Sequence, residues 1–436
     1  MGRTLKELVD PCWSAAWLIG AIVFLYVVLP IGVYRFSHED PYLLTLAAHS
    51  LVACVAIAVG FMTPICDSRF RPGAWRVNVD ARTLHFLVWG SFVLLLATTL
   101  VTAESVPLIS ALKGATAQEL SDQRAAFFKM RAGWQQALNY LNAFLTSYIM
   151  PMSFIGVMMG KSRYRVFVFF LFMAYCELII EKILYLRVLI PTIYLIAKGW
   201  FLNIYMIPVV VFGCFVMLYL NTYLARGSEP GQGPLVVVLN IFDSQSRDLP
   251  PASDPVQSPK GYEAQLEAPS GGASFFAADY APRTAFKQVL WRAFAIPVVT
   301  AADWYRVFEN KYGSRPFWGA TSSMVSALFG LERINFEALV HGTQWGGGEE
   351  SPSGRSNSFY VSEAYVNFGL PGVVVFSLFI GQALRWFYKS RDEAFRGIWL
   401  LFVFGMLTGG LIGNMFSNGL FIVFFYCLFV RVRKFF

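Results

Sequence analysis

Long apolar stretches constrain this chain more than any other feature. A helix needs about 20 apolar residues to cross a bilayer, and the 436-residue sequence holds about ten stretches of that kind. Lipid offers the backbone no hydrogen-bond partner, so such stretches must be helical. Only 14% of the residues are charged, against about 25% in soluble domains. The sequence therefore predicts an all-α polytopic membrane protein. The predicted spans are residues 12–34, 42–65, 84–103, 134–160, 166–180, 183–197, 205–222, 368–388, 398–414 and 419–430.

Lysine and arginine fall mainly in every second loop between these stretches. They precede the first span, follow the second, fourth, sixth and eighth, and close the chain at residues 431–434. Loops rich in Lys and Arg stay in the cytoplasm, so ten spans place both termini there. The net charge of +8 follows this pattern. No nucleic-acid motif accompanies it, and nucleic acid is not expected as a partner.

The spacing of the stretches divides the chain into three parts. Residues 1–222 form an N-terminal bundle of about seven spans, with an external amphipathic helix near 115–132. Residues 223–362 form a large outward segment, flexible at 227–274, where Pro, Gly and Ser abound, and helical at 285–345. Its apolar periodicity is broken at Pro297. Residues 363–436 supply about three further spans.

Several cations lie on the outward side, against the usual bias. They are Arg124, Lys182, Arg187, Arg292 and Arg333. Arginine binds phosphate oxygens bidentately and stays charged at any working pH, so a diphosphate ligand would account for them. Arg187 lies within an apolar run, where a cation costs about 2.5–3.5 kcal/mol to insert unless it pairs or lines a wet cavity. The alternatives are solvated loop residues and a buried charge network that fixes helix packing.

Two outward residues are candidates for proton transfer. Glu363 lies just ahead of the span at 368–388, where the sequence predicts a carboxylate at the wet mouth of the bundle. His341 is the one histidine of four in the long outward segment, beside a Gly-rich stretch typical of a mobile lid. No His/Cys cluster, carboxylate quartet, Walker pattern or nucleophile elbow is present. The sequence thus predicts no metal and no cofactor, and the six cysteines, all in or beside apolar runs, predict no disulfide framework.

Four segments together resemble the Wzy-type polymerases of O-antigen and other oligosaccharide repeat units. They are ELSDQRAAFF, EKILYLRVLIP, VLWRAFAIP and SEAYVNFGLPG, in that order along residues 100–385. The outward stretch at 227–274 is longer than is usual in that family. The resemblance implies a GT-C-like multi-pass enzyme of the bacterial inner membrane with its active site on the periplasmic side.

The same resemblance implies the reaction and the partners. The growing polysaccharide would leave undecaprenyl diphosphate and join an incoming lipid-linked repeat unit, by metal-independent inverting transfer. The cations would hold the diphosphate, Glu363 or His341 would take the proton, and Tyr365 and Asn367 would contact substrate. The bilayer and a polysaccharide chain-length regulator would be the other partners.

Two other functions remain open from the sequence. An O-antigen ligase, or another GT-C transferase, would share the many spans and the large external loop. Residues 38–40, His-Glu-Asp after the first span, are the acidic group such an enzyme would carry there. A transporter of lipid-linked oligosaccharide is the third possibility, although no internal repeat is apparent.

Overall fold

The protein is described from a computed structural model. The described residues are 7–37, 39–70, 74–112, 123–124, 126–127, 131, 133–160, 164–179, 181–199, 275–276, 287, 290–345, 356 and 359–433. Five helical stretches within them are long and apolar enough to cross a membrane. The prediction of a multi-pass, predominantly helical membrane protein is therefore confirmed at that level.

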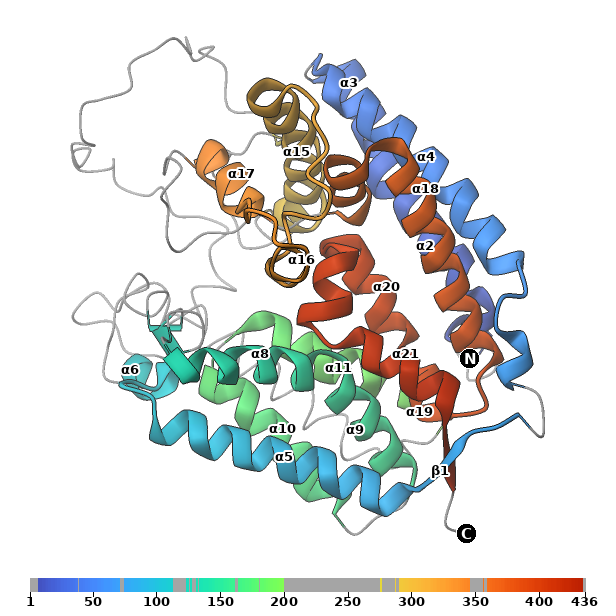
Figure 1. The fold of residues 1–436 in the computed structure, drawn as a ribbon, viewed down its shortest axis with the longest axis vertical. Helices are drawn as coiled ribbons and strands as arrows, with labels where there is room; N and C mark the ends of the chain where they lie inside the picture. Colours follow the sequence, from blue (N-terminus) through green and yellow to red (C-terminus); the bar gives the residue numbers. More distant parts are fainter. Residues whose placement is uncertain are drawn as a thin grey trace, which may run out of the picture.

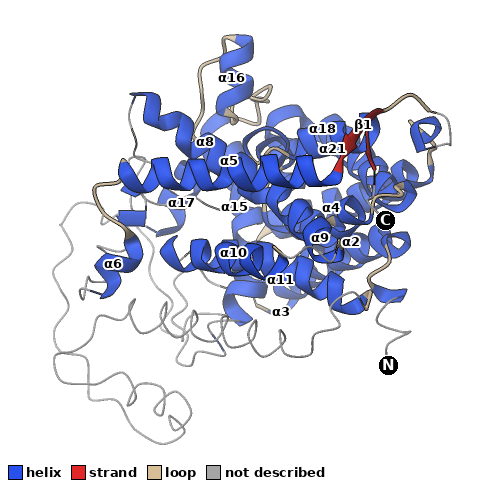
Figure 2. Cartoon of the chain, turned by 90° about the horizontal axis from the view of Figure 1, so that it is seen from below, coloured by secondary structure: helices blue, strands red, loops and turns tan. Residues whose placement is uncertain are grey.

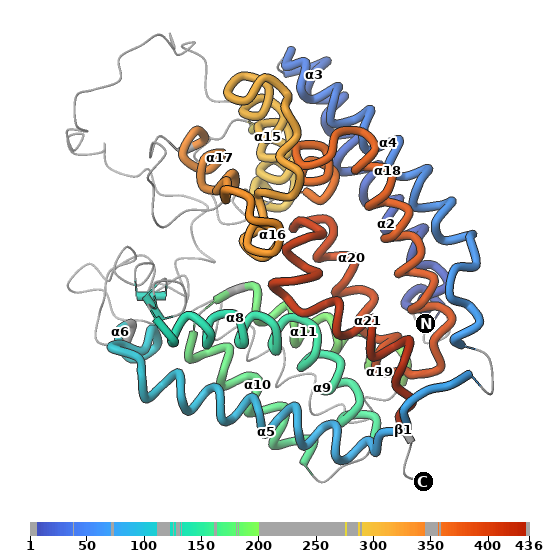
Figure 3. Tube along the Cα trace, in the orientation of Figure 1, coloured from blue at the N-terminus to red at the C-terminus, as the bar shows by residue number. Residues whose placement is uncertain are grey.

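One group of helices gathers around a central pair. The first span, Pro11–Phe36, combines η1 (Pro11–Trp13), α2 (Ser14–Val23), η2 (Phe24–Val28) and α3 (Leu29–Phe36). It packs on α4 (Pro41–Met62), which runs beside α18 (Tyr360–Lys389) in Figures 1 and 3. A Cβ on Gly60 would lie 2.2 Å from the carbonyl oxygen of Leu378, and one on Gly381 would lie 2.2 Å from that of Ile57. The two glycines thus permit backbone-to-backbone contact, the usual packing device between membrane helices.

A second group lies across the first in Figure 1. It holds α5 (Ala81–Val101), the composite span Gly133–Met159, α10 (Arg165–Ile179) and α11 (Lys182–Ala197). The composite span is made of η4 (Gly133–Gln135), α8 (Gln136–Phe144), η5 (Leu145–Ile149) and α9 (Met150–Met159). The helices α19 (Glu393–Gly397), α20 (Trp399–Thr408) and α21 (Leu420–Phe429) join the two groups. Further short elements are η3 (Asp67–Phe70), α6 (Pro107–Leu112), η7 (Gly413–Ser417), β1 (Val77–Asp80) and β2 (Val430–Arg433).

The predicted spans differ in how well they match helices. The stretches at 12–34, 42–65, 84–103, 134–160 and 368–388 correspond to the five long apolar helices. The stretches at 166–180 and 183–197 are the shorter, neighbouring helices α10 and α11. The one at 398–414 is interrupted at Gly409 and Gly410, and the last is the ten-residue α21. The stretch at 205–222 lies outside the described residues, as do residues 227–274 and most of 115–132.

Three prolines follow wide π-helical turns. Pro30, Pro151 and Pro297 come two residues after η2, η5 and η6 (Trp291–Ala295) respectively. Proline lacks the N–H that an α-helix needs and crowds the preceding turn. A π turn, which bonds over a longer interval, lets the helix pass each of these residues. The predicted break at Pro297 is therefore wrong, because the helix continues through it to Tyr312.

One end of the molecule collects chain segments that the charge pattern places together. Asp10 forms ion pairs with Lys198 at 3.0 Å and with Arg396 at 3.1 Å. Burial raises the pKa of Asp10, but Lys198 and Arg396 together hold it below its usual value. Asp67, after α4, pairs with Arg385 near the end of α18 at 2.6 Å. These contacts bring the predicted cytoplasmic loops to one side.

A small sheet closes the same end. β1 pairs in parallel with β2, Val77 opposite Val430 and Asp80 opposite Arg433, beside the N- and C-terminal labels in Figure 1. The sheet is a departure from the all-α prediction. Four-residue strands between long apolar helices carry too short a pattern to be recognised from sequence.

Candidate functional site

A helical layer covers the opposite end of α4 and α18. It consists of η6, α15 (Ile296–Tyr312), α16 (Ser323–Phe329) and α17 (Phe336–Trp345). An aromatic cluster holds this layer together, built from Trp304, Phe308, Phe317 and Phe336. Val298 and Ala302 of α15 are buried against Val33 and Leu43 at the loop between the first two spans. Since that loop is one of the predicted outward loops, the layer occupies the predicted outward end.

Glu363 lies in the first turn of α18 and is 6% exposed. Its Oε2 accepts a 3.1 Å hydrogen bond from the backbone N–H of Ile412, at the point where the chain resumes its helix after Gly409 and Gly410. A Cβ on Gly410 would lie 2.2 Å from Oε1, so only glycine allows the carboxylate this close. The prediction of a carboxylate in water at the bundle mouth is wrong. The side chain turns inward because the interrupted helix offers it backbone donors.

Asn367 is fully buried one turn later and holds the loop before α16. Its Oδ1 accepts from Gly319 N at 3.1 Å, and its Nδ2 donates to the Thr321 hydroxyl and to the Glu363 carbonyl oxygen, each at 2.9 Å. The carbonyl oxygen of Asn367 accepts from Trp318 N at 2.8 Å. In the structure Asn367 therefore joins the loop before α16 to α18.

The kink that separates Glu363 from the long part of α18 is at Gly369. Its φ of 66° lies in the left-handed region, which glycine enters without strain. Pro371 then opens the second part of the helix. Tyr365, just before the kink, packs its ring 4.4 Å from the His49 ring and 5.1 Å from the Tyr305 ring. It is half-buried in this aromatic group.

Arg187 lies inside α11 and donates a 3.0 Å hydrogen bond to the Thr146 hydroxyl on η5. Among the described residues no carboxylate pairs with it. Its side chain is half-buried. Among the described residues its side-chain hydrogen-bond partner is neutral, which makes Arg187 a candidate for binding an anion.

A polar seam in the bundle interior runs from η5 to the helix break at Gly410. Tyr148 donates to Asn414 Oδ1 at 2.9 Å, and Asn414 Nδ2 donates to the Gly410 carbonyl oxygen at 2.8 Å. The Glu363 carboxylate packs closely against Gly410 at one end of the seam. Arg187 is held beside the other end, at Thr146, two residues before Tyr148. The polar residues of the seam were not predicted. The signal for them was the asparagines within apolar runs.

His341 is half-buried on α17. Burial lowers its pKa, so the imidazole is neutral near pH 7 and able to accept a proton. Glu337, one turn earlier on α17, is close enough for its charge to act on Glu363. Its carbonyl oxygen accepts hydrogen bonds from Ser356. The Gly-rich stretch at 346–355, predicted to form a lid, lies outside the described residues.

The other predicted cations differ in exposure and in how much of them the structure describes. Arg292 and Arg333 are exposed on η6 and after α16, and Arg124 is half-buried in the short described piece at 123–124. Lys182 opens α11, and its side chain falls outside the described part. Arg131, by contrast, is buried and donates to the Thr99 carbonyl oxygen at 3.0 Å and to the Thr102 hydroxyl at 2.6 Å. It closes the C-terminal end of α5, where a cation is favoured.

A second polar cluster, which the sequence indicated only through residues 38–40, joins α4 to the outer layer. Arg306 of α15 forms ion pairs with both Asp40 and Asp303. Gln344 Nε2 donates to Asp303 Oδ2 at 2.7 Å. Burial raises the pKa of Asp303, although Arg306 opposes the shift. The cluster ties α4, α15 and α17 into one unit.

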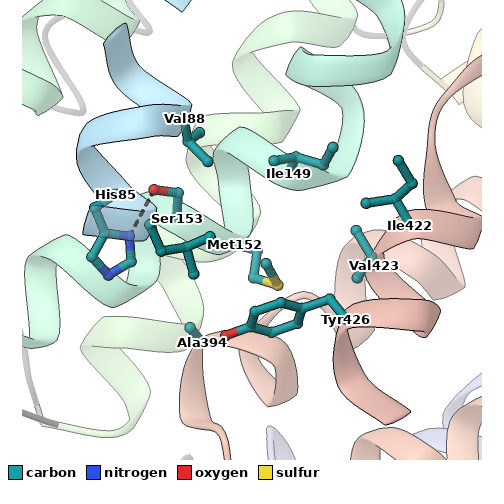
Figure 4. Close-up of a pocket in the computed structure, with 10 residues that line it drawn as sticks. His85, Val88, Ile149, Met152, Ser153, Ala394, Ile422, Val423 and Tyr426 are labelled. Carbon is teal, nitrogen blue, oxygen red and sulfur yellow. Dashed lines mark hydrogen bonds between the residues drawn. The ribbon is translucent and has the colours of Figure 1, made fainter. Parts of the chain in front are cut away.

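A cavity of ≈ 80 Å³ is lined by residues of α5, η5, α9, α19 and α21 (Figure 4). Its walls are apolar apart from Tyr426, Ser153 and His85, whose Nδ1 is 2.9 Å from the Ser153 hydroxyl. Ligand pockets measure about 300–1,000 Å³, so the cavity is too small for a sugar. Within the described residues no three His, Cys, Asp or Glu side chains are placed to hold a metal ion.

The fold and the site define a multi-pass membrane protein with a polar interior seam under a helical outer layer. No family model, no curated protein and no solved structure matches this chain.

Proposed function

We propose that this protein polymerises undecaprenyl-diphosphate-linked oligosaccharide repeat units at the periplasmic face of the bacterial inner membrane. An acceptor sugar hydroxyl attacks the anomeric carbon of the growing chain. The new C–O bond forms as the C–O bond to the diphosphate breaks, and undecaprenyl diphosphate leaves with the electron pair. A protein base takes the hydroxyl proton.

The observation that carries the proposal is that Arg187 has no ion-pair partner among the described residues. A cation in a membrane helix needs an anion or water, and the described residues offer it only neutral hydrogen-bond partners. A lipid diphosphate supplies the missing charge, and its developing negative charge in the transition state is where fixed positive charge lowers the barrier most. The Arg187 guanidinium would also favour a diphosphate-bearing lipid carrier over a neutral glycan.

The remaining roles follow from exposure and contacts. We assign proton acceptance to His341, because its imidazole is neutral and within reach of solvent. Glu363 positions the chain around Gly410, where the polar seam from Tyr148 ends. Tyr365 offers a half-buried ring against which a sugar would pack. We assign Lys182, at the start of α11, and Arg124, ahead of the span Gly133–Met159, as further groups that bind the diphosphate.

Arg187→Ala and Arg187→Lys in the producing bacterium test the proposal. The surface polysaccharide is run on a gel beside a deletion strain, with Arg35→Ala, an exposed arginine of α3, as control. Arg187→Ala is expected to reach the membrane and leave single-repeat material, while Arg187→Lys retains part of the ladder and Arg35→Ala all of it. A full ladder in the deletion strain would overturn the function. Loss of transfer to lipid A core with normal laddering would identify a ligase instead.

A further inference from the structure

The short helix α16 is turned with its polar side toward the protein. Ser326 is 4% exposed and donates to the Ala320 carbonyl oxygen at 3.1 Å. Met324, Leu328 and Phe329 point outward with 50%, 76% and 69% of their surface exposed. In water this arrangement is unfavourable, because apolar surface stabilises a protein only when it is removed from water.

The outward face of α16 is held rigidly. The hydroxyl oxygen of Ser322 accepts from Val325 N at the start of the helix, and Gly330 ends it in the left-handed conformation. Asn367 fixes the preceding loop through Gly319, and Ile334 N bonds the Ala320 carbonyl oxygen at 2.9 Å. The apolar side chains are therefore presented by a built element with satisfied caps.

The face continues onto the membrane surface of α18. Trp318, 65% exposed, packs its ring 6.3 Å from that of Phe368 at the kink. Beyond the kink the exposed side chains are Leu370 and Val375, on a helix long and apolar enough to cross the bilayer. Figure 2 shows α16 projecting from the body of the molecule beyond the neighbouring helices. Exposed apolar side chains are thus found on the span, at its kink and on α16.

Exposed arginines flank α16 in the chain, Arg315 ahead of it and Arg333 after it. Arginine close to an apolar segment suits the phosphate layer of a bilayer, where hydrocarbon and anionic headgroups meet. The chemistry of a headgroup above hydrocarbon therefore matches both parts of the surface.

We propose that α16 is a lipid anchor, whose face formed by Trp318, Met324, Leu328 and Phe329 inserts into the hydrocarbon of the outer leaflet. Bilayer phospholipid is the occupant. The anchor fixes the height of the outer layer relative to the membrane, and through Asn367 it couples that height to the kink of α18. The inference does not depend on the proposed enzymatic function.

Spin labelling of the full chain in phosphatidylethanolamine/phosphatidylglycerol liposomes tests the anchor. All six cysteines are replaced by serine and a nitroxide is attached through Phe329→Cys, with Glu332→Cys, exposed just after α16, as control. Collisions with oxygen, which concentrates in hydrocarbon, are compared with collisions with a water-soluble nickel chelate. Position 329 is expected to favour oxygen at least several-fold and position 332 to favour nickel. Equal nickel access at both positions, or a nitroxide at 329 that neither reagent reaches, would overturn the anchor.

A second measurement covers the case in which the serine-substituted chain does not fold. Benzoylphenylalanine replaces Leu328 in the chain with its native cysteines, and the liposomes are irradiated. A phospholipid adduct on the peptide that holds position 328 is the expected product. An adduct to protein alone would show that another chain or segment covers α16, and would refute the anchor.

Discussion

Asn367 Nδ2 donates a 2.9 Å hydrogen bond to the main-chain carbonyl oxygen of Glu363, four residues earlier in the first part of α18. The two side chains then diverge. Glu363 reaches the helix break at Gly410, while Asn367 reaches the loop before α16. A single helical turn therefore fastens the C-terminal helices and the outer layer to the same kinked span.

Removing the Asn367 side chain is expected to loosen the outer layer. Asn367→Ala leaves the buried N–H of Gly319 and the Thr321 hydroxyl without their partner. An unsatisfied buried group costs about 1–3 kcal/mol, so the unfolding midpoint of the detergent-solubilised protein should fall and protease should cut the 313–335 region sooner. Asn335→Ala, at an exposed position, is the control. Unchanged protease sensitivity in Asn367→Ala would contradict the clamp.

Substitutions of Glu363 and of His341 are expected to affect different properties, stability in the first case and polymer synthesis in the second. Glu363→Ala removes the acceptor for Ile412 N, so stability should drop by roughly 1–3 kcal/mol, and Glu363→Gln should lose less because one oxygen remains. His341→Ala should keep its stability and lose polymer synthesis by about 10²–10⁴-fold if it takes the proton. Thermal unfolding and the polysaccharide ladder, measured on the same variants, separate the two. A stable Glu363→Gln protein without a ladder would return the proton-accepting role to Glu363.

The α4–α18 contact should tolerate no side chain at Gly381. A Cβ there would lie 2.2 Å from the Ile57 carbonyl oxygen and 2.7 Å from Phe61 N, so Gly381→Ala must push two backbones apart. We expect a lower unfolding temperature and less protein in the membrane. Gly20→Ala places its methyl group where no atom lies within 4 Å, and it should be neutral or better. Equal behaviour of the two variants would show that the helices do not touch at Gly381.

Asp303 should make stability fall as pH rises. Burial raises its folded-state pKa above the ordinary 3.8, so between that value and the raised one the folded state binds more protons than the unfolded state. Stability is then greatest below the unfolded pKa and declines as pH rises through the folded one. Asp303→Asn removes the titrating group and with it this pH-dependent contribution to stability. The unfolding midpoint of the wild type, relative to Asp303→Asn, is therefore expected to decrease from pH 4 upward, and a relative increase would reverse the assigned shift.

Cys12 and Cys66 are expected on one side of the membrane. Both are exposed, and they adjoin Asp10 and Asp67, whose arginine partners are Arg396 in α19 and Arg385 near the end of α18. Cys66→Ser reports on Cys12, Cys12→Ser reports on Cys66, and the double variant gives the background. An impermeant maleimide should label both in inside-out vesicles only. Labelling from opposite sides would exclude the proposed topology.

Hydropathy along the chain was enough to predict a multi-pass helical membrane protein, because a run of about 20 apolar residues has few other stable conformations. The charge pattern also predicted which loops share an end, since it does not depend on how the helices pack. Arg187 was found in the same way, as a cation where hydropathy predicts lipid.

The tertiary structure decided what the singled-out side chains do. Glu363 is buried because a helix break 47 residues later in the chain, at Gly410, supplies both space and a backbone donor, and nothing near Glu363 in the sequence reveals this. The prolines after π turns, the parallel pairing of β1 with β2 and the outward-facing apolar side of α16 likewise depend on neighbours far away in the chain. Hydropathy is a local property, whereas hydrogen-bond satisfaction and close packing are settled only when distant segments meet.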